Sequence, residues 1–341
     1  MIDLLVAGCG PAGAATAIRA ALAGLSVVVL EPRQGPIDKA CGEGIAHSAV
    51  NYLDRLGVEL TGRPFHGIRY LDADHSVDAR FTAGPGLGVR RTTLHQALLD
   101  RLAELNVPVI PARVGPITQN TTSVTAAGHT ARYLAAADGL HSPIRRQLGL
   151  SGERTAQSAP TRRGLRRHYQ VSPWTDLVEV YWSPLGEAYV TPVADDLVGV
   201  AVLTTARGTL DSHLDAFPAL KRRLSSATPA STVMGAGPLR QHVHQRVSGR
   251  VLLVGDAAGY IDALTGEGIA VALRTSAELV DCVIADRPAD YEAAWRRVSR
   301  ECRLLTASLL WARNRSLLAP HIVPAAARLP GIYAHIVNRL S

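Results

Sequence analysis

The stretch LLVAGCGPAGAATAIRAALAGLSVVVLE, residues 4–31, decides the fold of this chain. It reads as a buried strand over 4–7, a glycine turn over 8–13, an alanine-rich helix over 14–23 and a second buried strand over 25–30. That order predicts a parallel β–α–β unit, because two parallel strands need a crossover connection. We therefore expect an α/β protein with a Rossmann-like fold.

The glycine turn has the spacing of a pyrophosphate site. Gly8 allows a tight turn, Gly10 lets the backbone approach a phosphate, and Gly13 lets the helix pack closely on the strand. The N-terminus of that helix faces the phosphates. Glu31 ends the second strand, where it can accept hydrogen bonds from an adenosine ribose, so it argues against a 2′-phosphate there. The alternative is a glycine-rich turn without a ligand, which the agreement of all these elements disfavours.

Composition excludes several other classes of protein. The chain has 341 residues, of which 47% are hydrophobic and 19% charged, so it is long and apolar enough to fold around a large core. The net charge of +7 favours anionic ligands such as phosphates or carboxylates. Nucleic acid is not an expected partner, because like charges form no long run and aromatic residues are only 5%.

The cysteines and the N-terminus indicate a reducing compartment. Cys9, Cys41, Cys282 and Cys302 lie far apart and form no C-x-x-C pair, so neither disulfides nor a metal site are expected. The N-terminus lacks the positive region of a signal peptide, and no transmembrane helix is visible. We expect a cytoplasmic protein.

Further along the chain, the residue pattern changes in two segments. Over residues 65–88 polar and apolar residues alternate in short stretches bounded by turn signals, as in antiparallel strands. Residues 155–245 contain strands rich in β-branched and aromatic residues, which also indicates an antiparallel sheet. A buried strand over 251–254 precedes a helix that starts near Gly268. Residues 290–318 read as one long arginine-rich helix, which fits packing on the main body better than contact with a membrane surface.

Three separated motifs give the chain a resemblance to a known family. They are Gly8-x-Gly10-x-x-Gly13 with Glu31, then Asp138-Gly139-Leu140-His141-Ser142-x-x-Arg145, then Gly255-Asp256-Ala257-Ala258 with Thr265-Gly266-Glu267-Gly268-Ile269. In this order they resemble the FAD-dependent group A flavoprotein monooxygenases and their geranylgeranyl-reductase relatives, over residues 1–285. The resemblance implies a glutathione-reductase-type FAD-binding domain (1–64, 89–154 and 246–288), an antiparallel-sheet substrate domain (65–88 and 155–245) and C-terminal helices (289–341).

The resemblance also implies a set of cofactor contacts. Asp256 would bind the ribityl chain of FAD, Gly266 and Gly268 would bring backbone N–H groups to the flavin, and Arg91 would contact phosphate or ribityl oxygens. The alternative for Arg91 is a surface arginine. The complete set is Gly8, Gly10, Pro11, Ala12, Gly13, Glu31, Pro32, Arg33, Cys41, Gly42, Arg91, Asp138, Gly139, Gly255, Asp256, Gly266, Gly268 and Ile269.

The loop Lys39-x-Cys41-Gly42-Glu43-Gly44 sits where reductase-like members carry a Cys-Gly loop beside the flavin ring. Cys41 is a candidate proton donor there, against the alternative of a small side chain in a crowded loop. Glu43 and His47 are candidate bases by their position in the loop, although a structural role is the better explanation for each. No metal site is expected.

The resemblance implies an NAD(P)H-dependent monooxygenase of secondary metabolism, which hydroxylates or epoxidises a partly apolar small molecule with O₂ through a flavin C4a-hydroperoxide. NADPH or NADH would visit only transiently. Two alternatives stay open: reduction or desaturation of a carbon–carbon bond, and a flavin-binding protein without turnover. Halogenation is set aside, because the tryptophan pair and lysine typical of flavin halogenases are not visible.

Two features of the segment 155–245 bear on the substrate. Tyr189-x-Thr191-Pro192 partly matches the aromatic motif of geranylgeranyl reductases, with Thr191 in place of an aromatic residue, which disfavours a long isoprenoid substrate. An arginine cluster is expected to meet an anionic substrate or an NAD(P)H phosphate; its members are Arg162, Arg163, Arg166 and Arg167. Peripheral membrane contact is compatible with the sequence, which does not indicate an oligomeric state.

Overall fold

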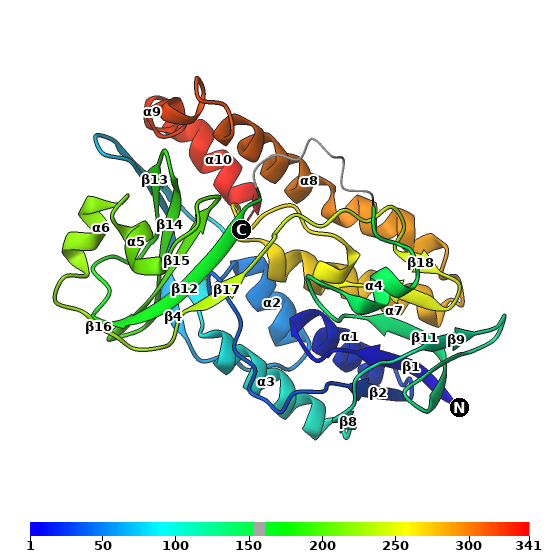
Figure 1. Cartoon of the computed structure of the whole chain (residues 1–341). Helices are drawn as coiled ribbons and strands as arrows, with labels where there is room; N and C mark the ends of the chain where they lie inside the picture. Colours follow the sequence, from blue (N-terminus) through cyan, green and yellow to red (C-terminus); the bar gives the residue numbers. More distant parts are fainter. Residues whose placement is uncertain (153–160, 341) are drawn as a thin grey trace.

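A computed structural model describes residues 1–152 and 161–340 of the chain. Two large β-sheets lie next to each other, with helices packed on both, and the long helix α8 (Asp290–Arg313) runs past them along one side of the molecule (Figure 1). The expected boundary at residues 154 and 155 and the end of the segment 289–341 lie outside the described residues. The division into domains stays a prediction.

The first sheet contains the predicted β–α–β unit. Its strands run in the order β18-β19-β11-β1-β2-β8, and the five from β19 to β8 are parallel. The antiparallel additions are β18 at one edge and the β9–β10 hairpin beside β11. The bounds are β1 Ile2–Ala7, β2 Val27–Leu30, β8 Val109–Ile110, β9 Ile117–Gln119, β10 Val124–Ala126, β11 His129–Ala136, β18 Val247–Ser248 and β19 Val251–Leu253.

Helices cover this sheet because each presents an apolar face to it. The alanine-rich α1 (Pro11–Leu22) packs against both α3 (Arg91–Glu104) and α7 (Gly268–Ile284), and small side chains let these helices approach closely. The core of this half is buried to near-zero exposure along β1, β11 and β19. Two shorter helices, α2 (His47–Arg55) and α4 (Pro143–Gln147), follow loops that reach the site described below.

The second sheet is the expected antiparallel one, in the order β16-β12-β15-β14-β13-β5-β6, with β17 beside β12. One pairing differs: β5 and β13 are parallel, which the long stretch of chain between them permits. Helices α5 (Leu210–Leu214) and α6 (Pro218–Arg223) cover one face. The strands are β5 Gly67–Leu71, β6 Ser76–Arg80, β12 Arg163–Gln170, β13 Val178–Ser183, β14 Gly186–Ala194, β15 Leu197–Thr204, β16 Thr228–Pro229 and β17 Met234–Ala236.

A small third sheet is formed by strands that come before and after β5 and β6 in the sequence. Its order is β3-β7-β4, and all its pairs are antiparallel. The bounds are β3 Gly44–Ile45, β4 Arg63–Phe65 and β7 Gly86–Gly88.

The C-terminal helices pack on the second sheet, but the long helix is shorter than predicted. Helix α8 ends at Arg313 rather than 318, because Asn314 and Ser316 are poor helix formers and Pro320 follows. Its buried residues include Tyr291 and Trp295, so packing on the main body is confirmed. After a short turn (Ala319–His321), α9 (Ile322–Arg328) and α10 (Pro330–Leu340) lie against β6. Among the described residues, no helix is long and apolar enough to span a membrane.

Candidate FAD and substrate site

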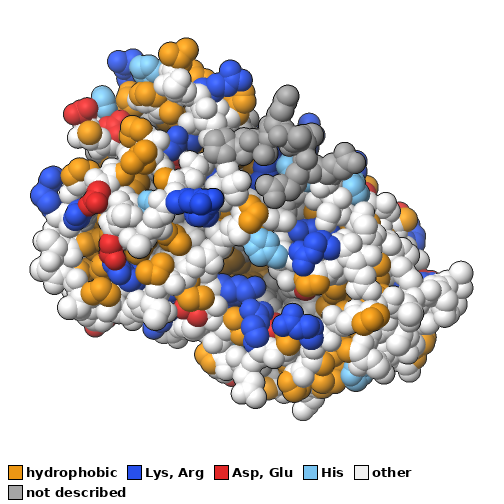
Figure 2. Space-filling model, in the orientation of Figure 1, with side chains coloured by type: hydrophobic (Ala, Val, Ile, Leu, Met, Phe, Trp, Pro, Cys, Tyr) orange, Lys and Arg blue, Asp and Glu red, His pale blue; other side chains and the backbone are white. Residues whose placement is uncertain are grey.

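A cavity of about 700 Å³ lies where the two large sheets meet. Its walls come from the ends of β1, β11 and β19, the loop that contains Cys41, the N-terminus of α7, the inner face of the second sheet and the C-terminal helices. The surface is hollowed near the middle of one face, and Lys, Arg and His side chains border the hollow (Figure 2). This basic border favours an anionic ligand.

The glycine turn has no room for side chains. Gly8 has φ +100°, and a Cβ there would lie 2.5 Å from the carbonyl oxygen of Ala137. A Cβ on Gly13 would lie 1.9 Å from the carbonyl oxygen of Gly8. Gly10 precedes α1, and Pro11 occupies the first helical position, so the helix N-terminus opens on the cavity. Residues 8–13 thus form the close-approach turn that the sequence predicts.

Charged side chains surround this end of the cavity. Arg91 is only 6% exposed, lines the cavity, and has a buried Nη1 atom without a hydrogen-bond partner. Burial lowers the pKa of its guanidinium by disfavouring the charged form, which a bound anion would stabilise. Burial raises the pKa of the Asp256 carboxyl, which faces Lys39 and Arg91 across the same space. Arg91 is therefore a cavity residue and not a surface arginine.

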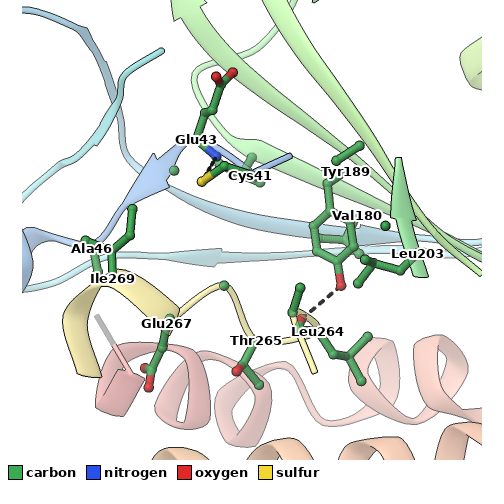
Figure 3. A pocket seen from close by; sticks show the side chains of 18 of the residues that line it. Cys41, Glu43, Ala46, Val180, Tyr189, Leu203, Leu264, Thr265, Glu267 and Ile269 are labelled. Atoms are coloured by element: carbon green, nitrogen blue, oxygen red, sulfur yellow. Dashed lines mark hydrogen bonds between the residues drawn. The ribbon is translucent and has the colours of Figure 1, made fainter. Parts of the chain in front are cut away.

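The loop with Cys41 forms another wall. Cys41 lies opposite Leu264 and Thr265, whereas the carboxylate of Glu43 points away from them; Val180, Tyr189 and Leu203 close the side formed by the second sheet (Figure 3). The Glu43 amide donates to Sγ of Cys41 over 3.4 Å. Burial and the neighbouring Glu43 raise the pKa of the Cys41 thiol. Cys41 is thus a protonated thiol at neutral pH on the wall of the cavity.

Glu43 itself is only 1% exposed and belongs to a network that anchors this loop to β12. Its Oε1 accepts from the Arg91 amide at 2.8 Å, and its Oε2 lies 2.6 Å from Nε2 of His168. Arg166 pairs with Asp38 and donates to the carbonyl of Lys39 at 2.9 Å. The network fixes the loop at both ends of the Lys39–Glu43 segment.

The structure places most of the sequence-predicted residues on the cavity wall. They are Gly10, Pro11, Ala12, Cys41, Gly42, Glu43, Arg91, Gly139, Gly255, Asp256, Gly266, Gly268 and Ile269.

Other predicted residues lie off that wall. His47 is not among the lining residues; its ring contacts the Pro85 carbonyl and Asn51, which is a structural arrangement. Asp138 accepts from the Ile144 amide at 3.0 Å and keeps a buried Oδ1 without a partner.

Glu31 lies beside a separate, smaller cavity of about 260 Å³. Its Oε2 accepts from the Cys9 amide at 3.0 Å, and Arg33 pairs with its Oε1 at 2.8 Å. Arg33 also lines the smaller cavity, whereas the exposed Pro32 lines neither. Glu31 therefore ties the end of β2 to the glycine turn.

Three of the four members of the arginine cluster are paired with carboxylates inside the protein, and one of these three, Arg166, also lines the cavity, so contact of the cluster with an anionic substrate or an NAD(P)H phosphate stays a prediction. Arg162 is buried and paired with Glu187 at 2.6 Å and Asp262 at 2.8 Å. Arg166 pairs with Asp38, and Arg167 pairs with Asp211. Carboxylates from distant parts of the chain neutralise these cations, and their positions could not be read from the local sequence. Arg163 is half-buried.

Two functional neighbours were missed. His168 shares the buried face of β12 with Arg166, and the two-residue spacing of a strand was the available signal. Glu267 lines the cavity, with its carboxylate directed toward α8 and away from Cys41 (Figure 3), and burial raises its pKa to about 7. In the sequence Glu267 is a charged residue between two loop glycines, and this pattern does not predict that it is buried.

These residues fit FAD on three observations. The turn at Gly8–Gly13 excludes side chains, as a pyrophosphate contact requires. Arg91 and Asp138 each keep a buried polar atom without a partner, and such atoms in native proteins call for a ligand or water. The backbone at Gly266 and Gly268 lines the cavity where α7 begins, which suits a ring that becomes anionic.

Comparisons with known proteins agree with this geometry. The FAD binding domain family model matches residues 1–182. Menaquinone reductase of Mycolicibacterium smegmatis is 29% identical over 88% of this chain and 80% of its own length. Ubiquinone hydroxylase UbiL of Rhodospirillum rubrum is 29% identical over 83% of this chain and 72% of its own length.

A solved structure extends the likeness to the whole chain. A triple mutant of the flavin-dependent brominase Bmp2 superposes with a TM-score of 0.82, covering 100% of this chain and 94% of the brominase at 17% identity. At that identity the likeness shows the fold alone. The family match spans more than half of the chain, and it includes the glycine turn and Arg91. The chain therefore belongs to the FAD binding domain family and is an FAD-dependent oxidoreductase of the group A superfamily.

Proposed function

We propose that the protein reduces a carbon–carbon double bond in a partly apolar small molecule. The observation that carries the proposal is the thiol of Cys41, which lines the same cavity as Gly42, Asp256 and Gly268. A raised thiol pKa suits a group that gives up a proton, and it does not suit a nucleophile. The similarity to menaquinone reductase over most of the chain supports reduction in preference to oxygenation.

The cofactor would be held by groups already in place. Arg91 and the turn at Gly10 would hold the phosphates, Asp256 the ribityl hydroxyls, and the backbone at Gly266 and Gly268 the ring. When bound and reduced, FAD supplies a hydride. We propose NADPH or NADH as the source of these electrons.

The protein supplies the proton that completes the reduction. One alkene carbon receives the hydride, and the other receives the proton from Sγ of Cys41, so the double bond becomes a single bond with two new C–H bonds. The thiolate of Cys41 then takes a proton from water. Glu43 and His168 hold the loop in place during this exchange, and the apolar walls keep bulk water from the reacting carbons.

The walls indicate a largely apolar substrate. Beyond Cys41 the cavity is lined by Tyr70 and Val180 from the sheet and by Leu309 and Ile322 from the C-terminal helices. Thr191, which replaces an aromatic residue of the reductase motif, donates to the carbonyl of Gly42 at 2.7 Å and so supports the Cys41 loop. The presence of Thr191 in place of an aromatic residue therefore does not argue against a substrate with an apolar chain.

Hydroxylation by O₂ is the second candidate. It is favoured by the similarity to ubiquinone hydroxylase UbiL and by the apolar walls of the same cavity, which would protect a reactive oxygen species. In that chemistry the thiol of Cys41 has no required role.

One experiment separates the two candidates. FAD-loaded protein is mixed with NADPH or NADH and menaquinone, the compound named for the mycobacterial relative, with and without O₂. Reduction of a carbon–carbon double bond predicts anaerobic conversion to a product that still carries two additional hydrogen atoms, by mass spectrometry, after air has re-oxidised any quinol to the quinone. A product that forms only in air and carries label from ¹⁸O₂ would establish hydroxylation instead. Protein that binds FAD but oxidises neither nicotinamide contradicts both.

A further inference from the structure

Large apolar side chains are exposed on the C-terminal segment of the chain. The exposed fractions are 56% for Trp311, 84% for Leu317, 39% for Leu318, 54% for Leu329, 57% for Ile332 and 40% for Ile336. We call these six residues the C-terminal apolar patch. They come from the end of α8, the turn after it, the junction between α9 and α10, and α10, which lie together at one end of the molecule (Figure 1). Hydrophobic and basic side chains lie next to each other over this end (Figure 2).

The same segment has an unbalanced charge. Residues 302–341 contain five arginines and no aspartate or glutamate; two of the five are paired with glutamates outside the segment, Arg313 with Glu187 and Arg339 with Glu301. Arg315 is exposed and stacks 4.8 Å over the ring of Trp311, and Arg328 is exposed at the end of α9. Tryptophan beside arginine, next to exposed leucines, is the composition of a segment that lies in the interface of an anionic bilayer.

The patch is continuous with the cavity. Leu329, Ile332 and Ile336 are exposed to solvent and also line the cavity. On their inner side, Tyr333 and Val337 of α10 are buried against β6. The apolar interior of the cavity therefore reaches the surface between the helices at the patch. A ligand that moves along this route stays in contact with apolar side chains throughout.

We propose that the C-terminal apolar patch docks on the surface of an anionic lipid bilayer. The positive charge around Trp311 complements acidic headgroups, and the leucines would enter the acyl boundary. A bilayer fits better than a second copy of the chain, because a second copy would bring the same arginines against each other. The argument rests on exposure and charge at α8–α10 and is independent of whether the enzyme reduces or hydroxylates.

Two aspartates near the C-terminal apolar patch limit the orientation in which the protein can dock on the bilayer. The turn between β5 and β6 contains Asp72 and Asp74, and α9 and α10 pack against β6. Acidic side chains are repelled by an anionic surface, so the bilayer meets α10 and the end of α8 on the side away from that turn.

The test is co-sedimentation of the FAD-loaded protein with vesicles. Vesicles of equal parts phosphatidylglycerol and phosphatidylcholine should bind the protein, and binding to pure phosphatidylcholine should be at least about tenfold weaker. The double variant Leu317→Gln/Leu318→Gln should lose about tenfold or more in affinity, because it removes side chains that enter the apolar layer. Arg315→Gln/Arg328→Gln should abolish the preference for phosphatidylglycerol and leave the weak binding to phosphatidylcholine.

The matched control is Leu22→Gln/Ile284→Gln, which changes exposed apolar residues at the ends of α1 and α7. This control should bind vesicles as the wild type does, and retained FAD absorbance shows that every variant folds. Equal binding by the Leu317/Leu318 variant and the wild type would overturn the proposal. So would protein that ignores vesicles and forms dimers, in light scattering, that the same variant splits.

Discussion

Oε2 of Glu43 lies 2.6 Å from Nε2 of His168, and both side chains are only 1% exposed. The contact joins the loop that contains Cys41 to β12 of the second sheet. Glu43 has φ +61°, a left-handed conformation that a non-glycine residue adopts at a cost. The buried carboxylate, held by His168 and by the Arg91 amide, offsets that cost and keeps the thiol in place.

We predict strong energetic coupling between Glu43 and His168. In a double-mutant cycle with Glu43→Gln and His168→Asn, the coupling energy should be about 1–3 kcal/mol in the free energy of urea unfolding, because the pair is buried. The same cycle on the exposed pair Lys221–Asp215 should give less than about 1 kcal/mol. Additive effects at Glu43 and His168 would show that the contact does not hold the loop.

A second prediction concerns Arg91. Arg91→Gln should weaken FAD binding by roughly 10–100-fold, because a charge-assisted hydrogen bond to phosphate contributes about 1.5–3 kcal/mol. Without FAD the variant should be no less stable than the wild type, because Nη1 of Arg91 is buried without a partner. Fluorescence titration with FAD and urea unfolding without it measure the two effects.

The exposed Arg113 provides the control for this pair of measurements. Arg113→Gln should change neither quantity. If Arg91→Gln lowers stability and FAD affinity by equal amounts, the arginine has a structural role and does not bind the cofactor.

The third prediction tests Cys41 as the proton donor. Cys41→Ala should lower kcat for double-bond reduction by about 10²-fold, the usual contribution of a positioned acid, with little change in KM. FAD content should stay the same. Because burial raises the pKa of Cys41, the wild-type kcat should stay constant through the usual range of thiol ionisation, near pH 8.5, and fall only above it.

Cys282 is the matched control, since it is a buried thiol of α7 that does not line the cavity. Cys282→Ala should keep the wild-type kcat and pH profile. Equal rates for Cys41→Ala and the wild type would favour the hydroxylase, in which the thiol has no required role.

The sequence predicts the parts of the fold whose causes are local. The β–α–β unit over residues 4–31 follows from apolar runs and a glycine turn, and the structure reproduces it. The antiparallel pairing of β13, β14 and β15 follows from alternation and short turns. The end of α8 was misplaced, because leucines continue in sequence past Arg313 while the helix does not.

The parts of the fold and of the site that depend on partners distant in sequence could not be predicted from the sequence. Arg162 and Arg167 look alike in sequence, yet one is buried against Glu187 and Asp262 and the other pairs with the exposed Asp211. Parallel pairing of β5 with β13 likewise depends on the whole sheet. Motif residues such as Gly10 were recognisable because their chemistry requires one residue type at a fixed spacing.

The last prediction uses the buried carboxyl of Glu267, whose Oε1 has no partner and whose pKa is raised by burial to about 7. In the unfolded chain this carboxyl ionises near pH 4.5, so its contribution to stability is complete below that pH and is lost as the pH rises through 7. The loss is up to about 3 kcal/mol, since one pKa unit corresponds to about 1.4 kcal/mol. Glu267→Gln cannot ionise and avoids this loss. The variant should therefore gain stability relative to the wild type between pH 5 and pH 8, measured by urea unfolding, while the exposed Glu59→Gln shows no such change. Parallel pH profiles for Glu267→Gln and the wild type would mean that Glu267 is solvated or paired in the folded protein, and its place on the cavity wall would then have to be revised.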